Sequence, residues 1–199
     1  QSSTPLPCGV SPDGKYVICG SVAGKLMTVI DQKTEEPVWS VAFDAGVRPI
    51  AFEKKADGST GRVFVQLSDF NGFAIVDFDQ HKEVGRVKLP EVSESERVTE
   101  GLQGSPSHGI GVTPDGKALW VLSKMNSRIY QYSMPDLKLM GEAKTGHHPD
   151  WLTFTMSASG NSAARSPAIE SSGRCAPMPT PVLSPRITMR STGMTTRRS

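Results

Sequence analysis

One stretch of this sequence joins a tight turn to a continuous apolar run: Thr113-Pro114-Asp115-Gly116-Lys117-Ala118-Leu119-Trp120-Val121-Leu122. Proline presets the first corner of a type I turn and glycine takes the corner where a positive φ costs least, so the chain reverses there. Related turns lie at 11–15 and 55–59, and the three turn aspartates are 44 and 58 residues apart. A polar insertion at 91–103 explains the longer interval. Self-similarity with a period of about 42 residues predicts a stack of four-stranded sheets.

The repeat around this stretch contains four short strands. We expect them at 109–112, 118–122, 129–132 and 137–140. Short strands at this spacing, without a helical period between them, predict an all-β repeat. Four strands in about 40 residues are typical of one blade of a β-propeller.

The first two repeats follow the same plan, and the connectors between repeats also align. Segments that begin at Gly46, Gly104 and Gly146 each start 11 residues before the turn aspartate, or before its expected position. The predicted fold class is therefore all-β: a β-propeller of four-stranded antiparallel blades, about three and a half of them, in an incomplete ring. The blades are expected at about 5–45, 46–90 and 104–145, and a fourth starts at 146–155.

These residues resemble a known family. The units at 11–17 and 113–117, the stretch at 29–34 and the Gly-x-x-Pro connectors are similar to the repeat of YVTN-type β-propeller proteins. That group includes secreted and cell-surface proteins, lactonase-like proteins and the haem d1 propeller of nitrite reductases, so the resemblance implies a periplasmic or extracellular location. Two departures stand out: Ala56 replaces the turn proline of the second repeat, and the fourth repeat lacks the turn.

The repeat pattern stops at residue 155. Residues 156–199 contain 9 Ser, 5 Pro and 5 Thr but no aromatic residue, so we expect this tail to be disordered. One interpretation is a native flexible tail whose stretch at 177–181 serves as an extended ligand. The other is a changed coding frame near Thr155, which the abrupt loss of lysine, aspartate and aromatic residues favours and which the nucleotide sequence tests.

An incomplete ring has consequences for assembly, because closed propellers use about four to eight blades. The open blade edges offer unpaired backbone groups, so self-association through these edges is one expectation. We interpret the chain as a fragment of a larger propeller. The alternative is that two copies complete one ring.

Charge divides the chain into two unlike parts. Residues 1–155 carry a net charge of −3 and residues 156–199 a net charge of +5, so the overall +2 gives no specific nucleic-acid signal. No long apolar run occurs, and we expect no membrane span. The start at Gln1, without an initiator methionine, is compatible with a processed secreted protein or a fragment.

The three cysteines, Cys8, Cys19 and Cys175, are too few and too scattered for a disulfide framework. No Cys-x-x-Cys-His haem attachment and no Cys-x-x-Cys zinc half-site is present. Cys8 and Cys19 both fall in expected strands, where a buried thiol is the commoner state. We therefore expect these two thiols to be unpaired.

Candidate binding residues come from the expected blade geometry. The connectors between blades and the turns between second and third strands share one face, which would bring together Arg48, His108, His147, His148 and Asp150 around one mouth of the channel. Aligning the connectors puts Arg48 opposite His148, and His108 opposite Asp150. Histidine there could bind a metal, ligate haem or carry a proton. The simpler interpretation, which we favour, is that these loop residues cap strand ends, since sequential histidines point opposite ways in extended chain.

Other notable residues receive structural assignments. We assign turn roles to Asp13, Gly14, Asp57, Gly58, Asp115 and Gly116, because each aspartate lacks the alternating oxygen ligands that calcium requires. Five strand aromatics are expected in the core: Trp39, Phe64, Trp120, Tyr130 and Trp151. The insertion at 91–103 is expected to be a solvated acidic loop, with contact to a basic partner as the alternative.

The sequence contains no Ser-His-Asp order, nucleophile elbow or phosphate-binding glycine loop. We therefore predict no catalytic residue, no metal site and no cofactor. The preferred interpretation is a non-enzymatic scaffold that binds an unidentified protein or small molecule. The alternative, which follows from the resemblance, is a catalytic propeller, either a haem d1-type redox domain or a lactonase-like hydrolase.

Overall fold

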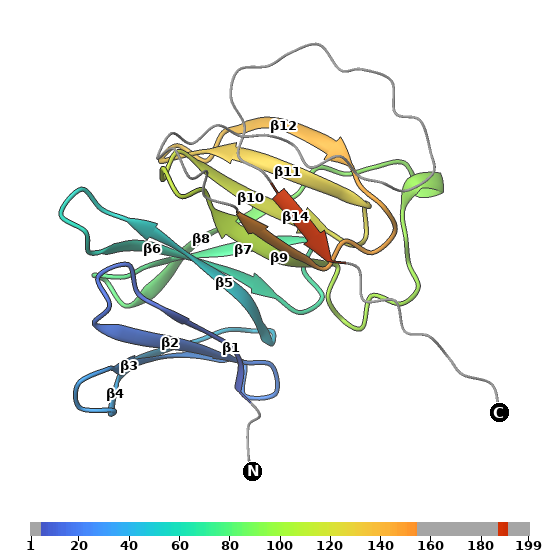
Figure 1. Cartoon of the computed structure of the whole chain (residues 1–199). Helices are drawn as coiled ribbons and strands as arrows, with labels where there is room; N and C mark the ends of the chain where they lie inside the picture. Colours follow the sequence, from blue (N-terminus) through green and yellow to red (C-terminus); the bar gives the residue numbers. More distant parts are fainter. Residues whose placement is uncertain (1–4, 155–186, 191–199) are drawn as a thin grey trace.

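The computed structural model describes residues 5–154 and 187–190, which form an all-β fold (Figure 1). Blade 1 consists of β1 (Pro5–Val10), β2 (Tyr16–Ser21), β3 (Leu26–Asp31) and β4 (Pro37–Ala42). Blade 2 consists of β5 (Val47–Lys54), β6 (Thr60–Leu67), β7 (Gly72–Asp77) and β8 (Lys82–Lys88). Blade 3 consists of β9 (Ser107–Val112), β10 (Ala118–Ser123), β11 (Arg128–Ser133) and β12 (Leu139–Lys144). A pair of strands, β13 (Trp151–Phe154) and β14 (Ile187–Arg190), follows, and a short 3-10 helix, η1 (Glu94–Glu96), lies in the insertion.

Each blade is an antiparallel meander in which neighbours in the sheet are also neighbours in sequence. The first strands of successive units lie side by side: β1 beside β5, β5 beside β9, and β9 beside β13. Figure 1 shows the blades following one another from blade 1 at the bottom to blade 3 at the top, without closing into a ring. The expected fold class, an incomplete propeller of four-stranded antiparallel blades, is confirmed.

Apolar clusters between the sheets hold the units together. One cluster lies between blades 1 and 2 and includes Met27 and Val63, and a second lies between blades 2 and 3 and includes Phe64 and Tyr130. β6 and β10 are buried almost throughout, because apolar side chains cover both of their faces. A smaller cluster packs residues of blade 3 against Leu152 and Phe154 of β13.

The fourth strand of blade 3 begins later than predicted. β12 spans Leu139–Lys144 instead of 137–140. Leu137 has a φ of 55° and its N–H donates to Ser133 O at 2.9 Å, so the turn continues through Lys138. Leu137 is apolar because it packs against the cluster between blades 2 and 3, although it lies in a turn. An apolar residue at this position therefore resembles the first residue of a strand.

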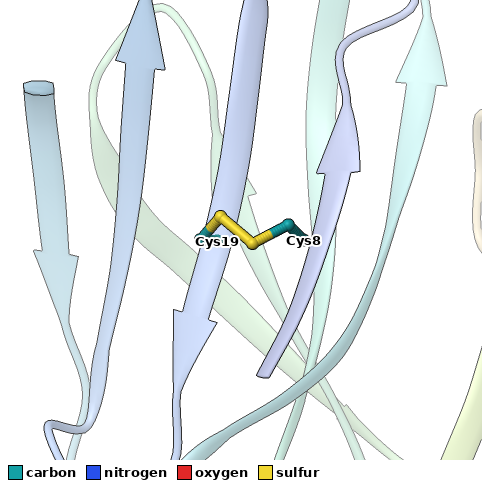
Figure 2. The surroundings of a disulfide bond; sticks show 2 residues. All are labelled: Cys8 and Cys19. Atoms are coloured by element: carbon teal, nitrogen blue, oxygen red, sulfur yellow. A yellow bond between two sulfur atoms is a disulfide. The ribbon is translucent and has the colours of Figure 1, made fainter. Parts of the chain in front are cut away.

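The prediction that Cys8 and Cys19 carry unpaired thiols is wrong. β1 and β2 pair with these two residues directly opposite each other, and their sulfurs form a disulfide (Figure 2). Direct cross-strand partners have neighbouring Cβ atoms, which brings two cysteines within bonding reach. The sequence places both residues in strands but gives no register, and register is what pairs them.

Glycines in β9 let the next unit approach closely. A Cβ at Gly109 would lie 3.0 Å from Asp150 O, and one at Gly111 would lie 2.9 Å from a side-chain carbon of Leu152. Glycine therefore allows β13 to pack directly on β9. This contact fixes the segment that carries Asp150 beside the start of β9.

Of the tail at 156–199, for which we expect disorder, the structure describes only the four residues of β14, which pair with β13. The rest of that tail, and the proposed extended ligand at 177–181, lie outside the described residues. Within the part of the chain that the structure describes, no helix is long and apolar enough to cross a membrane.

Candidate functional site

The end of the blades that carries the turns between first and second strands, here called the turn end, is occupied by local hydrogen bonds. The turn aspartates accept these bonds from their own turns: Asp13 from Ser11 Oγ at 2.7 Å, Asp57 from Ser59 N at 2.9 Å, and Asp115 from Thr113 Oγ1 at 2.6 Å. The glycines that follow have positive φ values: 73° at Gly14, 91° at Gly58 and 71° at Gly116. The carboxylates are thus engaged in holding the chain reversals.

The opposite end, which carries the connectors between blades and is here called the connector end, brings His108 and Asp150 into contact. His108 lies near the start of β9 and Asp150 directly precedes β13. Nδ1 of His108 is 3.2 Å from Oδ1 of Asp150 and 3.1 Å from its backbone oxygen. Lys124, directly after β10, places Nζ 3.2 Å from the same carboxylate oxygen. The side chain of Lys124 is only 9% exposed.

Burial changes the protonation of one residue of this cluster, His108. It lowers the pKa of His108 below the ordinary value of 6.5, because a buried imidazolium loses its hydration. The negative charge of Asp150 opposes this shift, whereas the positive charges of Lys124 and Arg48 add to it. His108 is therefore neutral at neutral pH, with its Nδ1–H donating to Asp150 and its Nε2 as an acceptor.

Arg48 reaches the connector end from β5 of blade 2. Its Nε donates to Ser68 Oγ at 3.0 Å, and its Nη2 donates to the backbone oxygens of Gln103 at 3.0 Å and Gly104 at 3.4 Å. All of these acceptors are neutral. The two backbone oxygens lie just before β9, and β5 lies beside β9, so Arg48 stands on the strand next to the one that carries His108.

His147 and His148 lie apart from this contact. The two rings are 5.0 Å apart and tilted by 54°. His148 packs over Gly101 of the insertion, since a Cβ added there would lie 2.6 Å from its Cε1. His147 lines a different hollow, beside the insertion. The structure thus brings His108 and Asp150 into contact, places Arg48 on the neighbouring strand β5, and leaves the histidine pair outside this contact.

Two residues of the cluster were missed or misassigned from the sequence. Lys124 sits in the turn between the second and third strands of blade 3, and the rule that these turns share a face with the connectors would have found it. Trp151 was expected in the core, but its side chain is 43% exposed and its ring meets that of His108 edge-on at 4.7 Å. It begins β13, which belongs to a two-stranded sheet with β14 instead of a complete four-stranded blade among the described residues.

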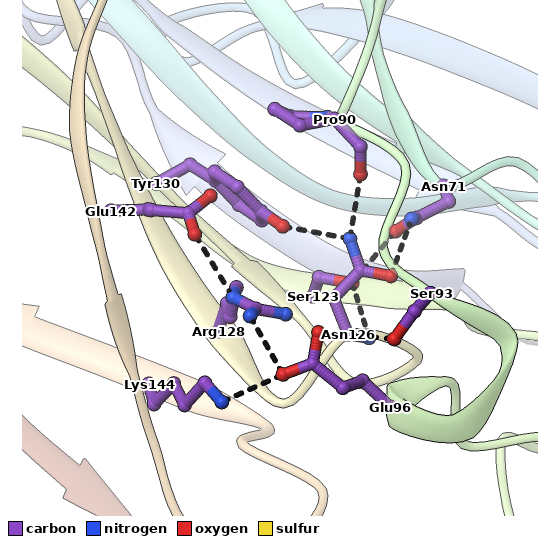
Figure 3. Close-up of polar contacts among 10 residues, drawn as sticks. All are labelled: Asn71, Pro90, Ser93, Glu96, Ser123, Asn126, Arg128, Tyr130, Glu142 and Lys144. Carbon is purple, nitrogen blue, oxygen red and sulfur yellow. Dashed lines mark hydrogen bonds and ion pairs between the residues drawn. The ribbon is translucent and has the colours of Figure 1, made fainter.

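The acidic insertion is largely exposed, as expected, and ion pairs also tie it to blade 3 (Figure 3). Oε1 of Glu96 is 3.1 Å from Nη2 of Arg128 and 2.6 Å from Nζ of Lys144. Nε of Arg128 is 3.0 Å from Oε1 of Glu142, so the buried guanidinium lies between two carboxylates. The basic groups that the insertion contacts, the alternative raised above, thus belong to the chain itself: Arg128 and Lys144.

A second polar network in Figure 3 joins blades 2 and 3 under the insertion. Asn126 donates through Nδ2 to Pro90 O at 2.9 Å and to the hydroxyl of Tyr130 at 2.7 Å. Ser123 Oγ accepts from the backbone N–H of Asn126 and donates to Oδ1 of Asn71, both at 2.9 Å. These bonds fix the turn that follows β10, and with it the position of Lys124.

Hollows among the described residues lie outside the cluster. One of about 680 Å³ opens at the turn end between β5, β9 and β13, where Phe52, Ile110 and Phe154 line it. Another of about 480 Å³ lies between the insertion and blade 3, lined by Thr99, Ser127 and His147 among others. Among the described residues, no group of three or more His, Cys, Asp and Glu side chains is arranged to hold a metal ion.

Comparisons with known proteins support the fold. No protein-family model and no curated protein matches the sequence. By contrast, 819 chains of solved structures match, so the fold is too widespread to select one activity. One of them is the hydrazine synthase of Kuenenia stuttgartiensis, with a TM-score of 0.60 and 20% sequence identity over 75% of this chain. The match spans 38% of that protein's chain, and at this identity the likeness shows the fold alone.

Proposed function

We propose that this chain is a non-enzymatic binding scaffold of the YVTN type, part of a larger propeller, which holds a small-molecule ligand at the connector end. The observation that carries the proposal is the convergence of His108, Lys124 and Asp150, within 3.2 Å contacts, on one face of a rigid sheet assembly. Arg48 lies on β5 of blade 2, the strand beside β9. Loops at one end of a rigid scaffold are where binding residues gather.

The YVTN assignment rests on the repeat residues themselves. The Pro-Asp-Gly-Lys turns at 12–15 and 114–117 and the Gly-x-x-Pro connectors carry it. The same repeats support blades at about 5–45, 46–90 and 104–145, the start of a fourth at 146–155, and a separate tail from 156. Limited proteolysis tests this division: cleavage should concentrate after residue 155 and inside the insertion, and cutting inside β6 or β10 would contradict it.

A periplasmic or extracellular location is part of the proposal. The disulfide between Cys8 and Cys19 supports it, because structural disulfides persist in oxidising compartments and are rare in reducing ones. Fractionation of cells that produce the complete parent protein tests this point. Recovery of the protein from the cytoplasm with both thiols reduced would contradict it.

The binding proposal is tested by a ligand-observed NMR screen of small molecules against the full chain. Hits that bind at the connector end should lose affinity with Asp150→Asn, which removes the charge that holds Lys124, and keep it with Asp57→Asn at the turn end. A set of hits that is insensitive to Asp150→Asn would place the binding site elsewhere. The absence of any hit would remove the proposal.

A catalytic role is the second candidate, and the His108–Asp150 contact favours it. A carboxylate that orients a neutral histidine through Nδ1 leaves Nε2 to act as a general base, which is the arrangement of hydrolytic enzymes. Lactone and ester hydrolysis lost with His108→Gln would support this candidate. Metal-dependent lactone hydrolysis has no fitting ligand set among the described residues.

Haem does not fit the two candidate histidines well. The ring of His108 packs edge-on against Trp151, and that of His148 lies over Gly101. Neither ring lines the hollow at the turn end or the one beside the insertion. Addition of haem to the protein should therefore give no Soret-region band that depends on His108 or His148.

A further inference from the structure

The guanidinium of Arg48 differs from the other cations near the connector end in having no ionic partner. Lys124 is paired with Asp150, and Arg128 is paired with Glu96 and Glu142. Arg48 donates only to a hydroxyl and two backbone oxygens, and no carboxylate of the described residues lies within 4.0 Å of it. A partly buried cation with neutral partners attracts an anion, because its charge is incompletely compensated and only weakly screened.

The neutral contacts of Arg48 also hold it in place. Bonds from Nε and Nη2 to β6–β7 and to the end of the insertion fix the plane of the guanidinium before any ligand arrives. Nη1 has no hydrogen-bond partner within residues 5–154 and 187–190. A fixed guanidinium loses little side-chain entropy on binding, which favours carboxylate and phosphate groups.

The carboxylates of Asp69 and Asp150 compete only weakly with an anionic ligand for the guanidinium of Arg48. Asp150 already accepts from His108 and Lys124. Asp69 lies across Gly104 from Arg48, since a Cβ added to that glycine would be 3.4 Å from Asp69 Oδ1 and 3.5 Å from Arg48 Nη2. Asp69 is exposed, so water screens its charge. A cationic ligand would find no unpaired buried carboxylate here.

Trp151 supplies a surface for the uncharged part of a ligand. Its indole is the exposed aromatic group of the cluster, and its ring meets that of His108 on β9, the strand that lies between the Arg48 strand β5 and β13. Exposed tryptophan beside a few fixed polar groups is the usual composition of a small-molecule site. A flat ring on the indole with an acidic group toward Arg48 would use both features.

We infer that the connector end binds a small organic anion, a carboxylate or phosphate carried on a flat ring, through Arg48 and Trp151. This inference rests on the proposed binding function and names its ligand class. It predicts preference for an anion over an uncharged molecule of the same shape.

The test compares benzoate, benzamide and benzylammonium by NMR of the ¹⁵N-labelled full chain, with the indole N–H signal of Trp151 assigned by Trp151→Phe. Benzoate should shift this signal, with an affinity at least about tenfold higher than that of the other two probes. Salt at about 0.5 M should weaken benzoate alone, because it screens the ion pair. Arg48→Gln should weaken benzoate about tenfold and leave benzamide unchanged, whereas Lys117→Gln, the same charge change at the turn end, should alter neither.

Asp69→Asn provides a variant that keeps Arg48 and its contacts. Removing the nearby negative charge should strengthen benzoate binding and leave benzamide unaffected. Equal shifts by benzoate and benzamide, insensitive to both substitutions, would overturn the anion inference while leaving a binding site at the connector end. If no probe shifts Trp151, and the wider ligand screen also finds nothing sensitive to Asp150→Asn, the proposed function fails as well.

Discussion

His108 is the residue whose chemistry depends most directly on its surroundings. Its pKa is lowered mainly by burial, so the folded chain binds its proton less readily than the unfolded chain does. The contribution of neutral His108 to the free energy of unfolding should therefore be complete above the ordinary pKa of 6.5. It should decrease as the pH falls below 6.5 and stop changing below the lower pKa of the folded state. NMR titration of the histidine ring protons measures this pKa directly, with the signal assigned by His108→Gln.

Asp150→Asn separates the effect of burial on the pKa of His108 from the opposing effect of the Asp150 charge. The carboxylate raises the pKa of His108 against the effect of burial, so its loss should lower the pKa further. A pKa of His108 at or above 6.5 in the unaltered chain would show that the ring is not buried as described.

Gly46 and Gly146 are equivalent in the repeat but differ in their surroundings. A Cβ at Gly46 would lie 2.6 Å from the backbone oxygen of Val22, which cannot move aside, whereas nothing lies within 4 Å of one at Gly146. Gly46→Ala should therefore cost about 1–3 kcal/mol in the free energy of unfolding, and Gly146→Ala less than about 0.5 kcal/mol. Denaturant titration compares them, and equal effects would contradict the close packing of blades 1 and 2.

At the same scale, the sequence predicts some positions of the connector end and misses others. Equal offsets from the turn place His108 opposite Asp150, and the two residues lie 42 positions apart in contact. Lys124 could have been found, because it lies in a turn between second and third strands, which shares a face with the connectors. The exposure of Trp151 could not, because it depends on what packs against β13 and not on residue spacing.

The insertion at 91–103 is the element most dependent on charge. Glu96 accepts from both Lys144 and Arg128, and these contacts hold its pKa below the ordinary value. Glu96→Gln should weaken the attachment of the insertion to blade 3 only modestly, because water and salt screen the charge of this exposed carboxylate. Protease cleavage within 91–103 should accelerate for Glu96→Gln and stay unchanged for Glu94→Gln, whose carboxylate has no ion pair among the described residues; identical rates would remove this role.

The β1–β2 hairpin is held by a covalent bond as well as by its ladder. Unfolded chain under non-reducing conditions should show one free thiol per molecule, and three after reduction, since the sequence has three cysteines and one disulfide joins Cys8 to Cys19. Reduction should lower stability by up to about 3 kcal/mol, the chain-entropy value for a loop of this size. Three free thiols before reduction would show that the bond does not form.

The sequence predicts most accurately the position of strands that flank a turn with an Asp-Gly pair. The strands on either side of the Asp-Gly turns appear where the pattern places them, because proline and glycine restrict the backbone locally. The start of β12 and the pairing of Cys8 with Cys19 depended on φ at one turn residue and on strand register. Such properties are determined by contacts with neighbouring strands, which apolar periodicity does not specify.

At the scale of the whole molecule, the faces of the blades are unequal. The side of blade 2 that carries Val63 and Val65 is buried against blade 1, and the side of blade 3 that carries Leu119 is buried against blade 2. The equivalent side of blade 1 carries Val10 and Val38, which are 55% and 53% exposed. Val17 and Ile30 lie opposite each other between them and are only partly buried. This side of blade 1 is therefore an apolar sheet face without the neighbour that its equivalents have.

An exposed sheet face of this kind should make the isolated chain self-associate, since contiguous apolar surface is buried when a second molecule covers it. We expect size-exclusion chromatography with light scattering to show a concentration-dependent increase in mass for the full chain. Val17→Lys and Ile30→Lys should reduce the increase, because a charge in that face would lose its hydration on association. Thr28→Lys, on the same face but at a polar position, should act more weakly, and Lys33→Glu in the β3–β4 turn should leave it unchanged. A strictly monomeric chain at high concentration would show that this face is stable in contact with water. Association that is insensitive to Val17→Lys would place the contact on another surface.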